Sequence, residues 1–424
     1  MLYSFAKIVM TSGLRFFYRH IHVTGFENIP STGPVIIIAN HNSSLMDAAL
    51  LGILLKRKAY FFARGDVFVN KPVQKILWWL HMMPVHSYQG GRNTLQVNNL
   101  SFSSGQQILS KGGIIVFFPE SYSHTEHHLM PFRKGVFRLA FDTASANNFS
   151  FDIPIVPIGL NYDHPVNSRT SVQVHADKPL LISSYKMEYN NNAAAALLHI
   201  CKDAHRAVCK LVLNVMDKER LQTAEHYMIV NRNDNPDAAT GWKIKSTQKL
   251  AREQNICTTI NNTAAIHFEN KKQKANAYFA LLADARLKDK TTTGFFSFPA
   301  WRKVMLWIGY PFYLIGLVLN GLPVLIARQI ADKKVYRKDF YSWIFVVSYS
   351  FAYFFWIIIL LIIFSLFGWN YAVGLLALII FTGLFAYIYN DWLKDSRQQK
   401  KWQKLTDTRK TKLIAMRKSL QEIV

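Results

Sequence analysis

A histidine and an aspartate six positions apart are the residues of this sequence best suited to chemistry. His41 follows the apolar run Val35–Ile38, and Asp47 begins an apolar stretch that continues to Leu55. A carboxylate that accepts a hydrogen bond from one imidazole nitrogen leaves the other nitrogen available as a base. The pair could therefore activate a hydroxyl group for attack on an acyl carbonyl, although this spacing alone also arises by chance.

Other polar residues lie at or near the ends of later apolar runs. Glu120 follows the run 114–118, and a buried carboxylate at such a point needs partners because an unpaired one is costly. Arg133 and Lys134 precede a predicted helix, and cations beside a helix N-terminus favour an anion. Pro157 lacks a backbone N–H group, so we expect it at a pocket wall or at a sheet edge.

The elements that must position these residues alternate between strand and helix. The predicted strands are 35–38, 114–118, 153–159 and 171–175, and the predicted helices are 47–55, 71–82, 95–110 and 135–146. This pattern predicts an α/β domain over residues 21–185, with a central, mostly parallel sheet flanked by helices. Ligands bind such sheets at the carboxyl ends of the strands, where His41 and Glu120 fall.

In this order the motifs resemble those of the glycerol-3-phosphate and lysophosphatidic acid acyltransferase family. That family has a histidine–aspartate block, a Gly/Arg block, a Pro-Glu-Gly block and a Val-Pro-Ile block, and the approach Val23–Pro30 is also similar. The likeness covers roughly residues 12–185. It implies that His41 is the general base, Asp47 its orienting partner and Glu120 a pocket organiser. It also implies a membrane location and an acyl-CoA or acyl-carrier-protein donor.

Three positions depart from the family pattern. Five residues separate His41 from Asp47, one more than the commoner spacing, and Ser121 replaces the glycine after the glutamate. The second block, Met83 to Ser87, lacks the expected arginine. Arg92 could substitute for it, or Arg133 and Lys134 could hold the phosphate of the acceptor. The identity of the acceptor is therefore left open.

Composition favours a membrane enzyme over a nucleic-acid-binding protein. The 424 residues carry a formal net charge of +24 and are 50% hydrophobic, with a mean hydropathy of +0.06. Nucleic-acid binding would explain the charge but not the long apolar runs, so we predict no nucleic-acid partner. Three cysteines without CxxC spacing predict neither a disulfide framework nor a zinc site, and the histidines at 124, 127 and 128 are interpreted as surface or substrate-loop residues. We predict no metal and no cofactor.

The remaining segments predict a multi-pass membrane protein whose catalytic domain faces the cytoplasm. Lys and Arg flank the apolar hairpin at both ends, and the tail holds ten Lys/Arg against four Asp/Glu. The predicted segments are an amphipathic surface helix (1–20), a helical connector (186–300), a membrane region (301–390) and a basic tail (391–424). Within the membrane region, 304–327 is re-entrant or spanning, and 340–367 and 371–389 form a transmembrane hairpin.

These observations predict an enzyme that moves a fatty acyl group from a thioester to a glycerolipid hydroxyl in phospholipid biosynthesis. Its expected partners are a phospholipid bilayer, an acyl-CoA or acyl-carrier-protein donor, and a phosphorylated acceptor, either glycerol 3-phosphate or lysophosphatidate. Two alternatives stay open. The acceptor could be a lipid without phosphate, which the missing arginine favours, or the chain could be an inactive membrane scaffold that binds lipid. The intact His41 and Asp47 argue against a scaffold.

Overall fold

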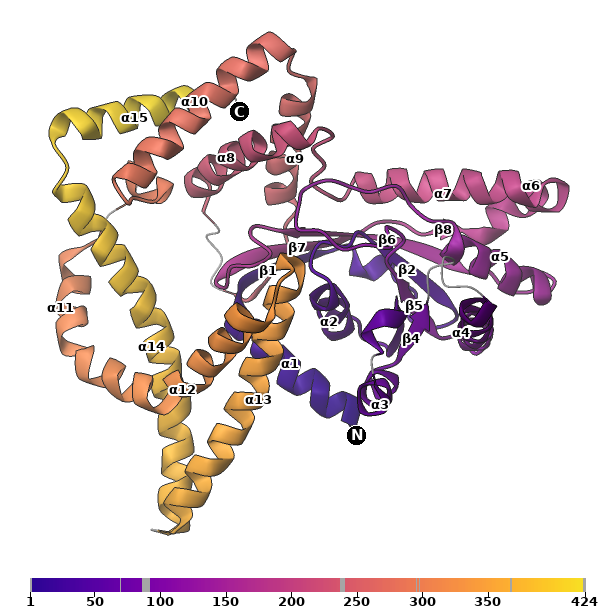
Figure 1. Ribbon diagram of the computed structural model, residues 1–424, viewed down its shortest axis with the longest axis horizontal. Helices are drawn as coiled ribbons and strands as arrows, with labels where there is room; N and C mark the ends of the chain where they lie inside the picture. The colour runs from indigo at the N-terminus through magenta and orange to yellow at the C-terminus, as the bar shows by residue number, and fades with distance from the viewer. Residues whose placement is uncertain are drawn as a thin grey trace. The chain divides into compact units, whose positions relative to one another are not determined.

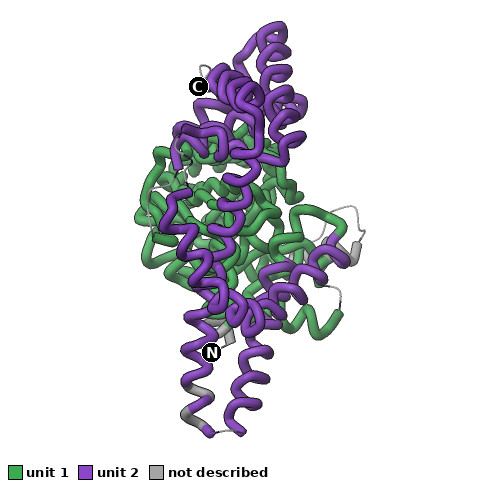
Figure 2. The backbone as a smooth tube through the Cα atoms, turned by 90° about the vertical axis from the view of Figure 1, so that its left-hand side faces the viewer, with its two compact units in different colours: residues 1–214, 240–250, 336–343 green, residues 215–239, 251–335, 344–424 purple. Residues whose placement is uncertain are grey.

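The chain folds into two compact units. The computed structural model describes residues 2–68, 70–85, 92–236, 241–294, 296, 298–366 and 368–421. Unit 1 comprises residues 1–214, 240–250 and 336–343, and unit 2 comprises residues 215–239, 251–335 and 344–424 (Figure 2). Unit 1 therefore receives two short segments, 240–250 and 336–343, from later parts of the chain.

Unit 1 is built on one sheet, to which nine strands contribute within the described ranges (Figure 1). The strand order is β4-β3-β5-β2-β6-β7-β1-β9, with β8 beside β6. Strand β6 pairs antiparallel with β7 and β8, and the other pairs are parallel, so the predicted mostly parallel sheet is confirmed. The strands are β1 Tyr18–Thr24, β2 Val35–Ala39, β3 Ala59–Arg64, β4 Met82–Val85, β5 Ile114–Phe117, β6 Pro154–Tyr162, β7 Thr170–Ala176, β8 Leu180–Leu181 and β9 Lys243–Ile244.

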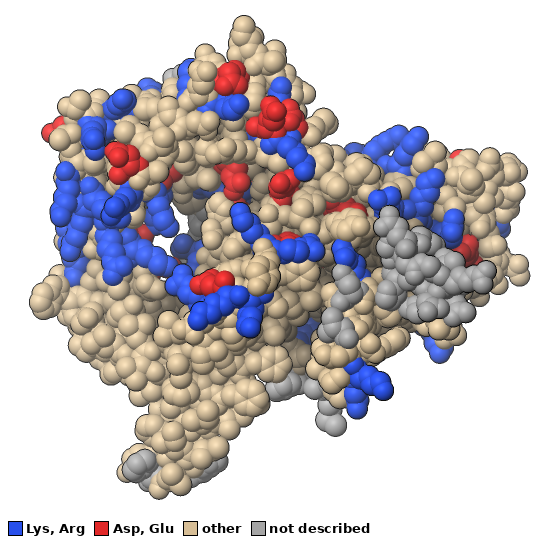
Figure 3. All heavy atoms as spheres, in the orientation of Figure 1, with Lys and Arg blue, Asp and Glu red and all other residues tan. Residues whose placement is uncertain are grey.

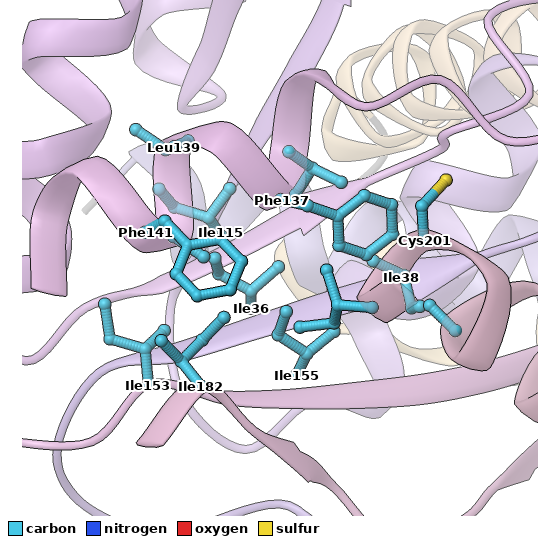
Figure 4. Close-up of a cluster of buried hydrophobic side chains, with 14 of the residues drawn as sticks. Ile36, Ile38, Ile115, Phe137, Leu139, Phe141, Ile153, Ile155, Ile182 and Cys201 are labelled. Atoms are coloured by element: carbon cyan, nitrogen blue, oxygen red, sulfur yellow. The ribbon is translucent and has the colours of Figure 1, made fainter. Parts of the chain in front are cut away.

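Helices flank this sheet. All five residues of β2 are buried, as expected for a central parallel strand covered on both faces. On one face, Ile36 and Ile115 belong to a core cluster with Phe137 and Phe141 of α5 and Cys201 of α7 (Figure 4). The helices of this unit are α1 Leu2–Phe17, α2 Leu45–Leu54, α3 Lys71–Trp79, α4 Arg92–Ser110, α5 Gly135–Ala146, α6 Lys186–Asn191 and α7 Ala193–Cys209.

The sheet tolerates a proline inside β6 because the strand changes partner there. Strand β8 pairs with Pro154 and Ile155, and β7 pairs from Ile158 onward, so Pro157 lies between the two pairings. The missing N–H group therefore breaks no ladder bond on that side. On the other side Pro157 is in register with Ile38 of β2. Because β6 is an interior strand, the sheet-edge placement expected for Pro157 is wrong, whereas the pocket-wall placement stays a prediction.

Unit 2 is helical and is held together by a buried ion-pair cluster. Arg417 of α15 contacts Asp289 at 3.0 Å and Asp234 at 2.7 Å, and Tyr278 donates a hydrogen bond to Asp289 at 2.6 Å. The helices are α8 Lys218–Asp234, α9 Gln248–Asn262, α10 Ala265–Asp284, α11 Ala300–Ile308, α12 Tyr310–Lys334, α13 Lys338–Ser365, α14 Trp369–Gln403 and α15 Asp407–Gln421. Helices α9 and α13 both begin within unit 1.

Three helices in the described ranges are long and apolar enough to cross a membrane: Tyr310–Lys334, Lys338–Ser365 and Gly374–Gln403. Neither Asn320 nor Pro323 ends α12. The side chain of Asn320 is hydrogen-bonded to the other two long apolar helices. Its NH2 group donates to the Ile379 carbonyl at 3.3 Å, and its oxygen accepts from the Tyr353 hydroxyl at 2.8 Å. In Figure 3 the described surface of the α13–α14 hairpin shows no Lys, Arg, Asp or Glu over its lower part, whereas Lys and Arg gather toward the C-terminal part of α14.

Candidate active site

His41 and Asp47 lie in direct contact beyond the carboxyl end of β2. The His41 Nδ1 atom is 2.9 Å from Asp47 Oδ2, and the carboxylate is completely buried while the histidine side chain is 18% exposed. The extra residue between them is accommodated in a turn at Ser44, which has a φ of 47° just before α2. A carboxylate can only accept, so Nδ1 carries the proton and Nε2 is left as the basic nitrogen.

Two further donors hold the Asp47 carboxylate in place. The Ser43 backbone N–H group donates to Oδ2 at 2.8 Å, and the Tyr162 hydroxyl donates to Oδ1. Burial, and then the negative charge of Asp47, raises the pKa of Tyr162 well above its ordinary value, so this hydroxyl keeps its proton and remains a donor. The buried negative charge is thus fully hydrogen-bonded and oriented toward His41.

Glu120 ties the loop after β5 to the histidine. Its Oε1 accepts from the His41 backbone N–H group at 2.7 Å, and its Oε2 accepts from the Met130 N–H group at 2.8 Å. The ring nitrogen Nε2 of His124 lies 3.2 Å from Glu120 Oε2. The backbone N–H group of His124 donates to the His41 carbonyl at 3.1 Å. Burial lowers the pKa of His124, but the hydrogen bond and charge of Glu120 outweigh it and raise that pKa above 6.5. Glu120 therefore positions the backbone of His41.

The ring of His41 is also held from the side. It stacks on Phe118 with ring centroids 4.2 Å apart and an interplanar angle of 15°. Below it, the Asn40 side chain bridges to β6, accepting from Leu160 N–H at 2.7 Å and donating to Leu160 O at 2.8 Å. With its tautomer, ring plane and backbone all constrained, His41 is preorganised to take a proton from a bound hydroxyl.

Comparisons with known proteins identify acyltransferases that are similar to this domain. Residues 20–161 match the family model described as Acyltransferase. Two chloroplastic 1-acyl-sn-glycerol-3-phosphate acyltransferases are similar: one from Brassica napus is 30% identical over 37% of this chain and 41% of its own length, and one from Arabidopsis thaliana is 29% identical over 41% and 47%. This chain carries an acyltransferase domain. The resemblance to the glycerolipid acyltransferase family is confirmed for that domain, and the match spans less than half the length of these two relatives.

A more distant similarity is to a solved structure. The crystal structure of the 1-acyl-sn-glycerophosphate (LPA) acyltransferase PlsC from Thermotoga maritima is 18% identical, with a TM-score of 0.34 over 47% of this chain and 78% of that chain.

The acyltransferase domain brings some of the other predicted residues to the Glu120 loop. Ser121, which replaces the family glycine, has a φ of 68°, a left-handed conformation that glycine adopts more readily. The Arg133 N–H group donates to Pro119 O at 2.8 Å, and the side chains of Arg133 and Lys134 are exposed at the start of α5. Arg92 begins α4, but its side chain lies outside the described residues, as do His86 and Ser87 of the second block.

The domain also contains site residues that sequence reasoning missed. The sequence contained a signal for Tyr162, because this residue ends a buried strand. His41 and Glu120 likewise lie just beyond the ends of buried strands. Asn40 precedes His41 in the sequence but received no role, and His124 was interpreted as a surface or substrate-loop residue and not as a partner of Glu120. Arg64 lies with its guanidinium 5.2 Å from the Tyr122 ring centroid, next to the Glu120 loop. Across the described positions, no group of three or more His, Cys, Asp or Glu is arranged to hold a metal ion.

Proposed function

We propose that this protein transfers a fatty acyl group from an acyl thioester to the free hydroxyl of lysophosphatidate, a step of phospholipid biosynthesis. The contact of His41 with the buried, fully hydrogen-bonded Asp47 carries this proposal, because it supplies a fixed base for a hydroxyl nucleophile. The choice of lysophosphatidate rests on the names of the two plant relatives, both 1-acyl-sn-glycerol-3-phosphate acyltransferases.

The reaction we propose is a direct displacement. The acceptor oxygen attacks the thioester carbonyl while His41 Nε2 takes the hydroxyl proton, so the new C–O bond forms as the imidazole becomes charged. Asp47 stabilises that charge from the Nδ1 side. The C–S bond then breaks, and the thiolate of CoA or acyl-carrier protein leaves and receives the proton from His41. We propose no covalent acyl-enzyme, no metal and no other cofactor for this chemistry.

Cations at the start of two helices and beside the Glu120 loop are the proposed holders of the acceptor phosphate. The candidates are Arg133 and Lys134 at the start of α5, Arg92 at the start of α4, and Arg64 beside Tyr122. Glu120 and Ser121 would shape the loop that faces the substrate, and Pro157 would line the pocket wall. Glycerol 3-phosphate is the second candidate acceptor. A lipid without phosphate is the third, favoured by the absence of the family's arginine near Ser87.

We also propose that the catalytic domain and the basic tail lie on the cytoplasmic side, with only the α13–α14 hairpin crossing the bilayer. Residues 336–343 at the start of α13 belong to unit 1, and a hairpin returns the tail to that side. The tail contacts the chain before α12 within unit 2, through Arg417 with Asp289 and Lys290 with Asp395. Both ends of α12 then lie on one side, so this helix would run along or partly into the membrane. The cations flanking the hairpin agree with a cytoplasmic placement.

Acyl transfer from labelled acyl-CoA or acyl-carrier protein tests the proposal. Purified membranes containing the wild type or His41→Ala would be offered lysophosphatidate, glycerol 3-phosphate and a phosphate-free lysolipid. We expect label in phosphatidate with the wild type and none above background with the variant. Transfer to another acceptor alone would refute the choice of acceptor. Absence of transfer to every lipid offered would refute the enzyme and favour the inactive scaffold.

A further inference from the structure

The start of α13 is built into the active site, although it lies about 300 residues from the histidine motif. Ser342 Oγ lies 3.0 Å from Ser43 Oγ, a pair separated by 299 positions, and both side chains are fully buried. Ser43 is the residue whose N–H group holds Asp47. One turn of a predicted transmembrane helix therefore rests directly on the loop that orients the catalytic carboxylate.

The same segment contacts the second loop around the histidine. The Ser123 hydroxyl donates to the buried carboxylate of Asp339, 216 positions away. Arg337 donates to Asp339 at 2.7 Å and 3.1 Å and to Ser123 O and Oγ at 3.3 Å. Ser123 directly precedes His124, whose N–H group donates to the His41 carbonyl. Both loops that hold His41 are thus bonded to one short segment.

An acidic residue in the first turn of a helix has a simpler explanation, since it complements the helix dipole. That explanation does not account for the direction of the Asp339 side chain, which accepts from a loop of the acyltransferase domain. Nor does it account for Ser342, a polar group buried against another serine just before the apolar part of the helix. Buried polar groups that pair in this way restrict the relative positions of the elements that carry them.

We propose that residues 336–343, the α13 brace, are a positioning element of the active site. Ser342 holds the His41–Asp47 loop and Asp339 holds the Glu120–His124 loop, so the two loops keep the geometry that proton transfer needs. Through the brace, the helix that enters the bilayer is also part of the structure that positions the base. This inference rests on the proposed acyl transfer and adds that the domain formed by residues 1–214 is incomplete without the start of α13.

The test compares kcat and KM of full-length variants in lipid nanodiscs. Asp339→Ala and Ser342→Ala are expected to lower kcat roughly tenfold or more with little change in the KM for acyl-CoA, because displaced catalytic groups slow the chemical step. Asp339→Asn and Ser342→Thr keep a hydrogen-bonding group and are expected to recover part of that loss. Ser350→Ala, a buried serine on the same helix but in unit 2, is the matched control and should keep the wild-type kcat.

A double-mutant cycle separates positioning from a general loss of stability. If Asp339 acts through Ser123, then Asp339→Ala combined with Ser123→Ala should lower kcat no further than the more damaging single change. Wild-type kcat in folded Asp339→Ala and Ser342→Ala proteins would overturn the proposal. So would an equal loss in Ser350→Ala, or fully multiplicative effects of Asp339→Ala and Ser123→Ala.

A crosslink tests the contact independently of activity. In a background without the three native cysteines, Ser43→Cys combined with Ser342→Cys should form a disulfide on mild oxidation, seen as a joined peptide pair by mass spectrometry. Absence of the joined peptides would overturn the brace even if the enzyme is active. Absence of acyl transfer by the wild type would instead refute the proposed function, so the two failures are distinguishable.

Discussion

Replacing Asp47 by asparagine tests the proposed role of its carboxylate as the partner of His41. In the structure, Oδ2 accepts from His41 Nδ1 and Ser43 N–H, whereas Oδ1 accepts from the Tyr162 hydroxyl. An asparagine can keep its oxygen at the Oδ2 position and turn its NH2 group toward Tyr162, because a hydroxyl also accepts. The histidine tautomer would then survive, and only the negative charge would be lost.

The magnitude follows from the charge that develops on His41. With the contacting atoms 2.9 Å apart, the charge centres of imidazolium and carboxylate lie about 4 Å apart, which corresponds to about 4 kcal/mol at an effective dielectric constant of about 20. Since 1.4 kcal/mol is a factor of ten, kcat should fall about a thousandfold, with little change in KM. Asp47→Ala also loses the orienting bond and should fall further.

The assay is thiol release from acyl-CoA at saturating acceptor, normalised to folded protein by thermal unfolding. Asp152→Asn is the matched control, because Asp152 is bonded to Ser183 in the same unit and has no contact with the His41 loop among the interactions described. A fall in kcat of less than tenfold in folded Asp47→Asn would refute the reasoning, since it would mean that the buried charge does not stabilise the imidazolium.

Three further predictions follow. Because the pKa of His124 is raised, its charged form stabilises the folded protein. This stability is fully present below about pH 6.5 and is lost as the pH rises through the raised pKa. His124→Gln should flatten this part of a plot of unfolding free energy against pH, and an unchanged slope would contradict the prediction. Ser121→Gly should leave the protein equally stable or up to ~1 kcal/mol more stable by thermal unfolding, because Ser121 occupies a left-handed conformation; a clear loss of stability would argue against strain there. Single cysteines in place of Lys303, in α11 just before α12, and Lys333, in the last turn of α12, should react with a membrane-impermeant thiol reagent from the same face of sealed vesicles, whereas labelling from opposite faces would show that α12 crosses the bilayer.

The strands of the sheet differed in how well the sequence predicted them. The apolar runs at 35–38 and 114–118 matched β2 and β5, because parallel strands buried on both faces must be apolar throughout. Strand β1 was not predicted: it carries His20 and His22 among its apolar residues and directly follows a basic, amphipathic helix. Strand β9 has only two residues, too few to show a period, and depends on its pairing with β1.

The sequence by itself determined which residues could do chemistry and which predicted elements they stand beside. His41 and Glu120 follow buried strands and Asp47 stands at the start of a helix, and residue type and position relative to such elements are local properties. Only the tertiary structure decided what surrounds them: Tyr162 on Asp47, Glu120 on the His41 backbone and Ser342 on Ser43. These contacts join residues 79 to 299 positions apart, so they depend on strand order and on the path of the chain. No local periodicity encodes that path, because it is set by burial and hydrogen bonding over the whole fold.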